Sequence, residues 1–206
     1  MPELPDQFFQ RQDESPDEAF YEQARLVTHI DDATISSLTA FYEAVIPVDT
    51  RILDLMSSWI SHLPAGASYR RIAGLGMNAE ELKANPALQE WRVQNLNEQP
   101  ALPWDDTAFD AVLIAVSVQY LTRPFEVFAE IARVLEPGGQ CIVAMSHRLF
   151  PTKAIQAFRM LSPNDRCRLV ASYMDHAGLD GIEALDQSPA DADPLWIVRG
   201  RKPEAA

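Results

Sequence analysis

From Arg51 onward, short apolar runs alternate with segments whose apolar residues recur at helical spacing. The runs AVLIAV (111–116) and CIVAM (141–145) are apolar at every position, which is typical of strands with helices packed on both faces of the sheet. The alternation therefore predicts an α/β domain built from βαβ units around a mostly parallel sheet. The expected strands are 51–55, 71–77, 91–96, 109–115, 140–146, 181–187 and 195–201, with the last two joined as a hairpin-like pair.

Composition narrows the classes of protein that this chain can belong to. At 206 residues and 47% hydrophobic, it can bury one core of domain size. The net charge of -13, from 17 basic and 30 acidic residues, would repel a phosphate backbone, so we expect no nucleic-acid partner. No apolar stretch reaches the roughly 18 residues of a membrane helix, and the acidic start lacks the pattern of a signal peptide. We therefore expect a cytoplasmic protein with no membrane partner.

The two cysteines, Cys141 and Cys167, have no partner at metal-ligand spacing, so we expect no metal site. The serines lack a GxSxG elbow, which argues against a hydrolase even though Ser58 and His62 are four residues apart.

The first fifty residues differ from the rest and predict two further parts. Residues 1–15 are polar and contain proline, which favours a flexible arm. Ser15, Pro16 and Glu18 have the spacing of a capping box at a helix start. A second helix is expected over 32–44, because its apolar residues lie at three- and four-residue steps. We expect residues 16–50 to form a helical cover over the α/β domain of residues 51–206.

The segment LPWDDTAFDAVLIAVSVQYLTRPFEVFAEIARVLEPGGQCIVAMS (102–146) joins a Leu-Pro-aromatic turn, a Phe-Asp pair opening a strand, and a helix expected to stop at Pro-Gly-Gly. In this order the features resemble the central block of class I S-adenosylmethionine-dependent methyltransferases, and in particular the methyltransferase type 11 group. The resemblance covers about residues 51–145. It implies a Rossmann-like fold with seven strands, helices on both faces, and S-adenosylmethionine lying over the carboxyl ends of the first strands.

The first family motif departs from this pattern. Asp54 keeps the acid at the end of the first strand, but Met, Ser, Ser, Trp and Ile at 56–60 replace the glycine-rich turn. The resemblance assigns Asp54 to the cofactor, and the hydroxyls of Ser57 and Ser58 could face its carboxylate. The alternative is that SSWISHL (57–63) is an ordinary capped helix packed on the sheet.

The second and third strands also differ from the family. Gly76 stands where the family has the acid that binds the ribose hydroxyls. Met77 could lie on the adenine and Asn78 could supply a polar contact, or Met77 could be core and Asn78 the cap of the helix that follows. Asn95 and Leu96 resemble the Asp-Leu-Asn turn of the family, with the Asn95 amide oxygen in place of the carboxylate that meets the adenine amino group.

Candidate residues for the methyl-transfer step follow the later strands. Gln119 is a candidate cofactor contact and Tyr120 a candidate catalytic residue, unless both belong to a polar turn. His147 could act as a general base beside Arg148, which could bind a carboxylate. His29 lies on the expected cover and is a third catalytic candidate, while Asp31 and Asp32 beside it are also good helix caps.

Two functions from different classes follow. One is transfer of a methyl group from S-adenosylmethionine to a small-molecule acceptor through a remodelled cofactor loop. The other is a non-catalytic relative that binds a different ligand or a partner protein. Asp54, Asn95 and the intact central block favour the first, whereas the absent glycines and Gly76 favour the second.

Overall fold

In the computed structural model, which describes residues 4–204, seven strands form one sheet in the order β3-β2-β1-β4-β5-β7-β6. Strands β3, β2, β1, β4 and β5 pair in parallel, and β7 lies antiparallel to both β5 and β6. The predicted mostly parallel sheet and its terminal hairpin-like pair are confirmed. The strands are β1 (Arg51–Leu55), β2 (Arg71–Gly76), β3 (Glu90–Val93), β4 (Phe109–Ala115), β5 (Leu135–Met145), β6 (Asp180–Asp186) and β7 (Trp196–Arg201).

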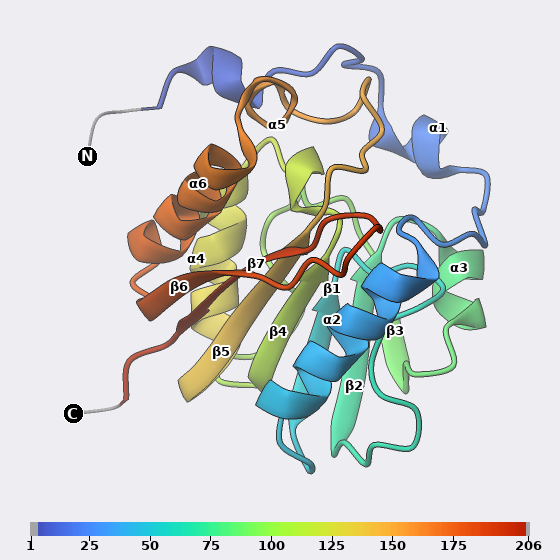
Figure 1. The fold of residues 1–206 in the computed structure, drawn as a ribbon, viewed down its shortest axis with the longest axis vertical. Helices are drawn as coiled ribbons and strands as arrows, with labels where there is room; N and C mark the ends of the chain where they lie inside the picture. The colour runs from blue at the N-terminus through green and yellow to red at the C-terminus, as the bar shows by residue number, and fades with distance from the viewer. Residues whose placement is uncertain (1–3, 205–206) are drawn as a thin grey trace.

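Helices cover both faces of this sheet (Figure 1). The long helix α2 packs on one face with Leu38 and Tyr42, whereas α4 and α6 lie together on the other face with Phe128 and Tyr173. The helices are η1 (Asp6–Phe9), α1 (Asp17–Tyr21), α2 (Asp32–Val45), α3 (Ala79–Ala84), η2 (Val118–Tyr120), α4 (Pro124–Val134), α5 (Gln156–Met160) and α6 (Pro163–His176).

The junction of α4 and β5 differs from the expectation. The helix starts at Pro124, which has no N–H to leave unpaired in the first turn, but it ends at Val134 and not at the Pro-Gly-Gly of 137–139. Leu135 is already extended and stands opposite Phe109 of β4, so the strand begins there. The helix predicted over 124–135 is therefore confirmed to within one residue. Pro-Gly-Gly does not stop it, however, because the strand expected from residue 140 begins at Leu135 and includes residues 137–139.

The two predicted helix starts have different outcomes. The Asp31 carboxylate accepts a hydrogen bond from the Thr34 backbone N–H at 2.8 Å, which confirms its capping role for α2. The capping box at Ser15 was wrong, because α1 begins after Pro16 without a side-chain cap. Ser15 instead bonds Lys153, whose Nζ donates to the Ser15 carbonyl oxygen at 2.6 Å.

The segment before α1 lies against the loop that leads into α5 (Figure 1). The Asp13 N–H donates to the Thr152 carbonyl at 2.9 Å, and the Gln156 N–H donates to the Gln10 carbonyl at 2.8 Å. Residues 1–3 of the predicted arm lie outside the described residues. From residue 4 onward, the arm follows the edge of the domain above the carboxyl ends of the strands.

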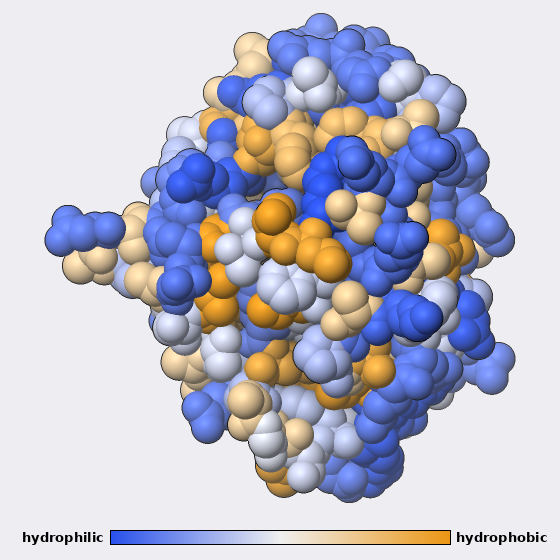
Figure 2. Space-filling model, turned by 90° about the vertical axis from the view of Figure 1, so that its right-hand side faces the viewer, coloured by the Kyte–Doolittle hydropathy of each residue, from blue (hydrophilic) through white to orange (hydrophobic). Residues whose placement is uncertain are grey.

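Within residues 4–204, no helix has the length and apolar character needed to cross a membrane. The face that carries α1 and α3 mixes apolar and polar side chains (Figure 2). Leu26 and Val27, between α1 and α2, have side chains that are more than half exposed.

Candidate functional site

A cavity of about 330 Å³ lies over the carboxyl ends of β1, β2, β3 and β4. Strands β1 and β4 are neighbours, and the chain proceeds from β1 toward β3 on one side and from β4 toward β5 on the other. Open α/β sheets bind ligands at such a reversal of strand order. The lining comes from the segments that follow the four strands, and from a cover made of residues 11–30 and 148–153.

Asp54 anchors the segment that follows β1. Its side chain is buried, and its Oδ2 accepts hydrogen bonds from the hydroxyls of Ser57 at 2.5 Å and Ser61 at 2.6 Å. Burial raises the pKa of Asp54 to about 6, although both hydroxyls oppose the rise. The two serines thus tie the turn to β1 by side-chain hydrogen bonds.

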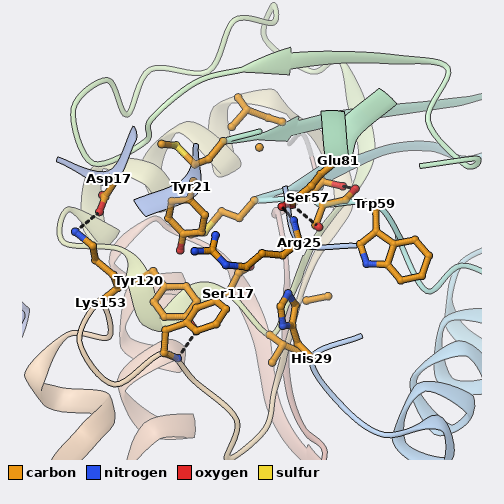
Figure 3. A pocket seen from close by; sticks show the side chains of 18 of the residues that line it. Asp17, Tyr21, Arg25, His29, Ser57, Trp59, Glu81, Ser117, Tyr120 and Lys153 are labelled. Carbon is orange, nitrogen blue, oxygen red and sulfur yellow. Dashed lines mark hydrogen bonds and ion pairs between the residues drawn. The ribbon is translucent and has the colours of Figure 1, made fainter. Parts of the chain in front are cut away.

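A second set of bonds ties the same segment to α3 and to the cover. The Ser58 hydroxyl donates to Glu81 Oε2 at 2.6 Å, and the Arg25 backbone N–H donates to Glu81 Oε1 at 2.7 Å. Asn85 Nδ2 donates to the Ser58 carbonyl and to Ser61 Oγ, both at 2.9 Å. Residues 57–61 are therefore held on several sides, and Glu81 joins them to the cover (Figure 3).

These bonds replace both the glycine turn of the family and the helix considered for 57–63. Residues 56–70 contain no helix, so that interpretation was wrong. Met56 has φ 58, a left-handed conformation that favours glycine, at the first position after β1. The backbone shape of a glycine turn is thus partly retained by a residue with a side chain.

Gly76 is required by the path of this segment. The Ser57 N–H donates to the Leu75 carbonyl at 2.7 Å, so the main chain runs on beside β2. A Cβ at residue 76 would lie 2.2 Å from the Ser57 carbonyl oxygen. The main chain therefore occupies the space into which an acidic side chain at this position would have to project.

The candidates after β2 and β3 divide into cavity residues and structural residues. Met77, Asn95 and Leu96 line the cavity. Asn78 does not line it, because its Oδ1 accepts from the Glu80 and Glu81 N–H groups and caps α3, which confirms the capping alternative. Asn95 Oδ1 accepts from the Asn97 N–H at 3.0 Å within its own turn, so its amide oxygen already has a partner.

The candidates after β4 also divide. Tyr120 lines the cavity, and its hydroxyl accepts from the Phe150 N–H at 2.8 Å. Gln119 is buried away from the cavity lining, and its amide donates to the Val116 carbonyl at 2.8 Å. Ser117 lines the cavity with a buried hydroxyl that has no hydrogen-bond partner among residues 4–204. That hydroxyl can bond to a ligand at the end of β4.

Three histidines were considered in the sequence, and two of them line the cavity. His29 stacks edge-on to Phe150 at 5.5 Å between ring centres, and burial lowers its pKa. His62 is also in the lining, and burial, with a smaller effect of His29, lowers its pKa to about 4. His147 lies outside the lining, half exposed, 3.3 Å from Asp193.

Arg148, the other residue considered for binding a carboxylate, does line the cavity. Its Nε donates to both carboxylate oxygens of Asp193 at 3.0 Å. The Arg148 guanidinium is therefore already paired with a carboxylate of the chain itself, Asp193.

The cover contributes residues that the sequence reasoning did not single out. Tyr21, Arg25 and Lys153 line the cavity (Figure 3). Phe150 also belongs to the lining. Arg25 ends the segment FYEQAR (20–25), which begins in the short helix α1. An arginine this close to two aromatic residues was the sequence signal that could have identified it as a cavity residue. No group of three or more potential metal-binding side chains occurs in the part of the chain that the structure describes.

Comparisons with known proteins agree with this architecture. Residues 60–143 match the model of the family described as "Methyltransferase domain". A demethylmenaquinone methyltransferase from Renibacterium salmoninarum is 43% identical over 51 residues, which cover 24% of this chain and 22% of that protein. The match therefore spans less than a quarter of the relative's length.

Two solved structures have the same fold at low sequence identity. The [4+2]-cyclase SpnF has a TM-score of 0.62 at 18% identity, over 82% of this chain and 81% of that one. The phosphoethanolamine N-methyltransferase 2 of Haemonchus contortus, solved in complex with S-adenosyl-L-methionine, has a TM-score of 0.60 at 13% identity, over 82% and 52%. The chain therefore has the fold of these proteins, and its residues 60–143 match the methyltransferase domain model.

Proposed function

We propose that the protein transfers a methyl group from S-adenosylmethionine to a small-molecule acceptor inside the cavity over β1–β4. The observation that carries the proposal is the position of this cavity at the reversal of strand order, where the fold binds ligands. Its volume of about 330 Å³ lies at the lower end of the range that small-molecule sites occupy. The match of residues 60–143 to the methyltransferase domain model supports the proposal.

The residues present fit the cofactor through groups that differ from the glycine turn. Ser117 offers a buried hydroxyl without a partner, and Met56, Met77 and Leu96 offer apolar surface on which an adenine can lie. Asp54 offers a carboxylate that a cationic ammonium group would stabilise in its charged form. When bound, S-adenosylmethionine supplies a methyl group on a positively charged sulfur.

The chain's part in the reaction is to position the two reactants and exclude water. The cover encloses the cavity from above, and Glu81 fixes the Arg25 backbone to the turn after β1. Holding two reactants in line supplies much of the rate of a transfer reaction. His29, whose pKa burial lowers, is a neutral imidazole near neutral pH and can take a proton from an acceptor, whereas the pKa of about 4 makes His62 a weak base.

A second candidate function is that of a non-catalytic relative, and the observation that favours it is at Gly76. Because the Ser57 main chain fills the space beside that glycine, an acidic side chain at position 76 has no room from which to reach a ribose. On this alternative the same cavity takes a different ligand.

A thermal-shift experiment with a cavity-filling variant distinguishes the two functions. We expect S-adenosylhomocysteine to raise the Tm of the wild-type protein, because a ligand that binds only the folded state stabilises it. Ser117→Trp should abolish the shift by filling the cavity, whereas Ser36→Trp, on the exposed side of α2, should retain it. An equal shift for both variants would place the ligand outside the cavity, and no shift for wild type would favour the non-catalytic relative.

A further inference from the structure

Aromatic rings gather on the cover side of the cavity. Tyr120 and Phe150 are stacked with their ring centres 5.8 Å apart, and Phe20 meets Phe150 edge-on at 5.4 Å. Tyr21 packs edge-on against Phe20 at 5.0 Å. Since Tyr21, Tyr120 and Phe150 all line the cavity, this side offers a surface on which a planar ring can stack.

The guanidinium of Arg25 lies among these rings. Its central carbon is 4.6 Å from the ring centre of Phe20 and 5.6 Å from that of Phe150. The guanidinium donates to the carbonyl oxygens of Phe20 at 2.8 Å and of Gln23 at 3.4 Å. These two bonds leave further N–H donors of its planar fork for a ligand.

Unlike the other cationic side chains of the cavity lining, the Arg25 guanidinium has no carboxylate partner among residues 4–204. Lys153 lies 3.3 Å from Asp13 and 3.4 Å from Asp17, and Arg11 lies 2.6 Å from Asp17. Arg148 bonds Asp193. Among residues 4–204, no carboxylate lies within 4.0 Å of the Arg25 guanidinium.

The guanidinium also points away from the end of β1. Figure 3 shows the Arg25 side chain extending from the neighbourhood of Ser57 toward Tyr21 and Tyr120. Contacts of 4.6–5.9 Å to the rings of Phe20, Tyr21 and Phe150 agree with this direction. A ligand that meets the guanidinium therefore lies on the aromatic side of the cavity and not against the serine turn.

From these observations we infer that the cover side of the cavity binds an aromatic carboxylate, which packs against the rings of Tyr21, Tyr120 and Phe150 and pairs with Arg25. The assignment of this compound as the methyl acceptor rests on the proposed function, whereas its binding does not. A charged hydrogen bond is stronger than a neutral one. Because the chain as a whole carries a charge of -13, binding of an anion depends on a local cation such as Arg25.

Calorimetric titration with 2-naphthoate and 2-naphthamide tests the inference, because the two compounds share a ring system and differ in charge. We expect wild type to bind 2-naphthoate about tenfold tighter than 2-naphthamide or more. Arg25→Gln should lose this preference, and Arg25→Lys should recover part of it, since an ammonium retains the charge without the fork. Arg168→Gln, at an exposed position on α6, is the matched control and should behave as wild type.

Equal affinity of wild type for the two compounds, or a preference that survives Arg25→Gln in the folded variant, would overturn the inference. The same variants are titrated with S-adenosylhomocysteine, whose affinity we expect to stay within about twofold of wild type. A tenfold loss there, with the preference for 2-naphthoate unchanged, would assign Arg25 to the cofactor's own carboxylate and also overturn it. Binding of 2-naphthoate through Arg25 without any binding of S-adenosylhomocysteine would support the site and refute the proposed methyl transfer.

Discussion

At the scale of single residues, Asp54 stands out because its burial favours the neutral acid while the proposed function favours the charged one. Burial raises the pKa of Asp54 to about 6, above the ordinary 3.8 of an exposed aspartate. The hydroxyls of Ser57 and Ser61 bond to the same oxygen. A site that destabilises the free protein and gains stability on binding a cation is common where function needs a charge.

The pH dependence of stability tests this interpretation of Asp54. An acid whose pKa is higher in the folded chain stabilises the fold while it is protonated. The contribution is therefore complete below pH 3.8 and is lost as the pH rises through about 6. We would measure the free energy of unfolding in urea between pH 4 and 7.5. As the pH rises over this range, the value for Asp54→Asn should increase relative to that of wild type by on the order of 2 to 3 kcal/mol. A difference between the two proteins that does not change with pH would contradict the raised pKa.

At the scale of elements, the turn after β1 depends on how closely it approaches β2. The Ser57 main chain passes Gly76 so closely that a Cβ would lie 2.2 Å from a backbone oxygen, which cannot move without the turn. At Gly74, on the same strand, a Cβ would meet only the end of the flexible Leu88 side chain, at 2.4 Å. The two glycines of β2 thus serve different purposes.

A comparison of alanine variants at these glycines measures the importance of the turn. We expect Gly76→Ala to cost about 1 to 3 kcal/mol in unfolding free energy, the range for overpacking, and to reduce binding of S-adenosylhomocysteine. Gly74→Ala should cost less, because Leu88 can move aside. The account of the turn fails if the two variants lose equal stability.

A buried lysine joins the two segments of the cover. Lys153 is fully buried, and it contacts Asp13, Ser15 and Asp17 of the N-terminal segment. Lys153 lies more than 130 positions after these three residues in the sequence. The cluster therefore joins the two segments of the cover, residues 11–30 and 148–153.

Lys153→Met should loosen this attachment. Because Arg11 still pairs with Asp17 in this variant, we expect a cost below the roughly 3 to 5 kcal/mol of a fully uncompensated buried charge. We expect faster amide hydrogen exchange in residues 4–20 than in wild type, with the exchange of β4 and β5 changed less. Arg168→Met, at an exposed ion pair on α6, is the control and should leave exchange in residues 4–20 unchanged. Identical exchange in wild type and Lys153→Met would show that the cover is held by other contacts.

At the scale of the whole molecule, the fold was predictable because its signal is local. Runs such as 111–116 are apolar on both faces, and α4 carries one apolar stripe, so strands and helices could be placed in order. The site was less predictable because long-range side-chain bonds build it. The bonds from Asn85 to Ser61 and from Arg25 to Glu81 join residues 24 and 56 positions apart, and no local pattern indicates them.

The candidate residues also divide into those that the local sequence placed correctly and those that long-range contacts decide. Asp54, Met77, Asn95 and Leu96 line the cavity, as their positions near the carboxyl ends of the strands suggested. Asn78 and Gln119 are used by the chain's own hydrogen bonds, and the helix considered as an alternative for 57–63 does not form. Arg25 reaches the cavity only because the cover folds back over the sheet, which the sequence indicates in outline but not residue by residue.

Calorimetric titration of the wild-type protein with S-adenosylhomocysteine tests the central claim most directly. The account predicts one site per chain, with a Kd on the order of micromolar. No heat of binding at millimolar ligand, with a protein that unfolds cooperatively and is therefore folded, would contradict it.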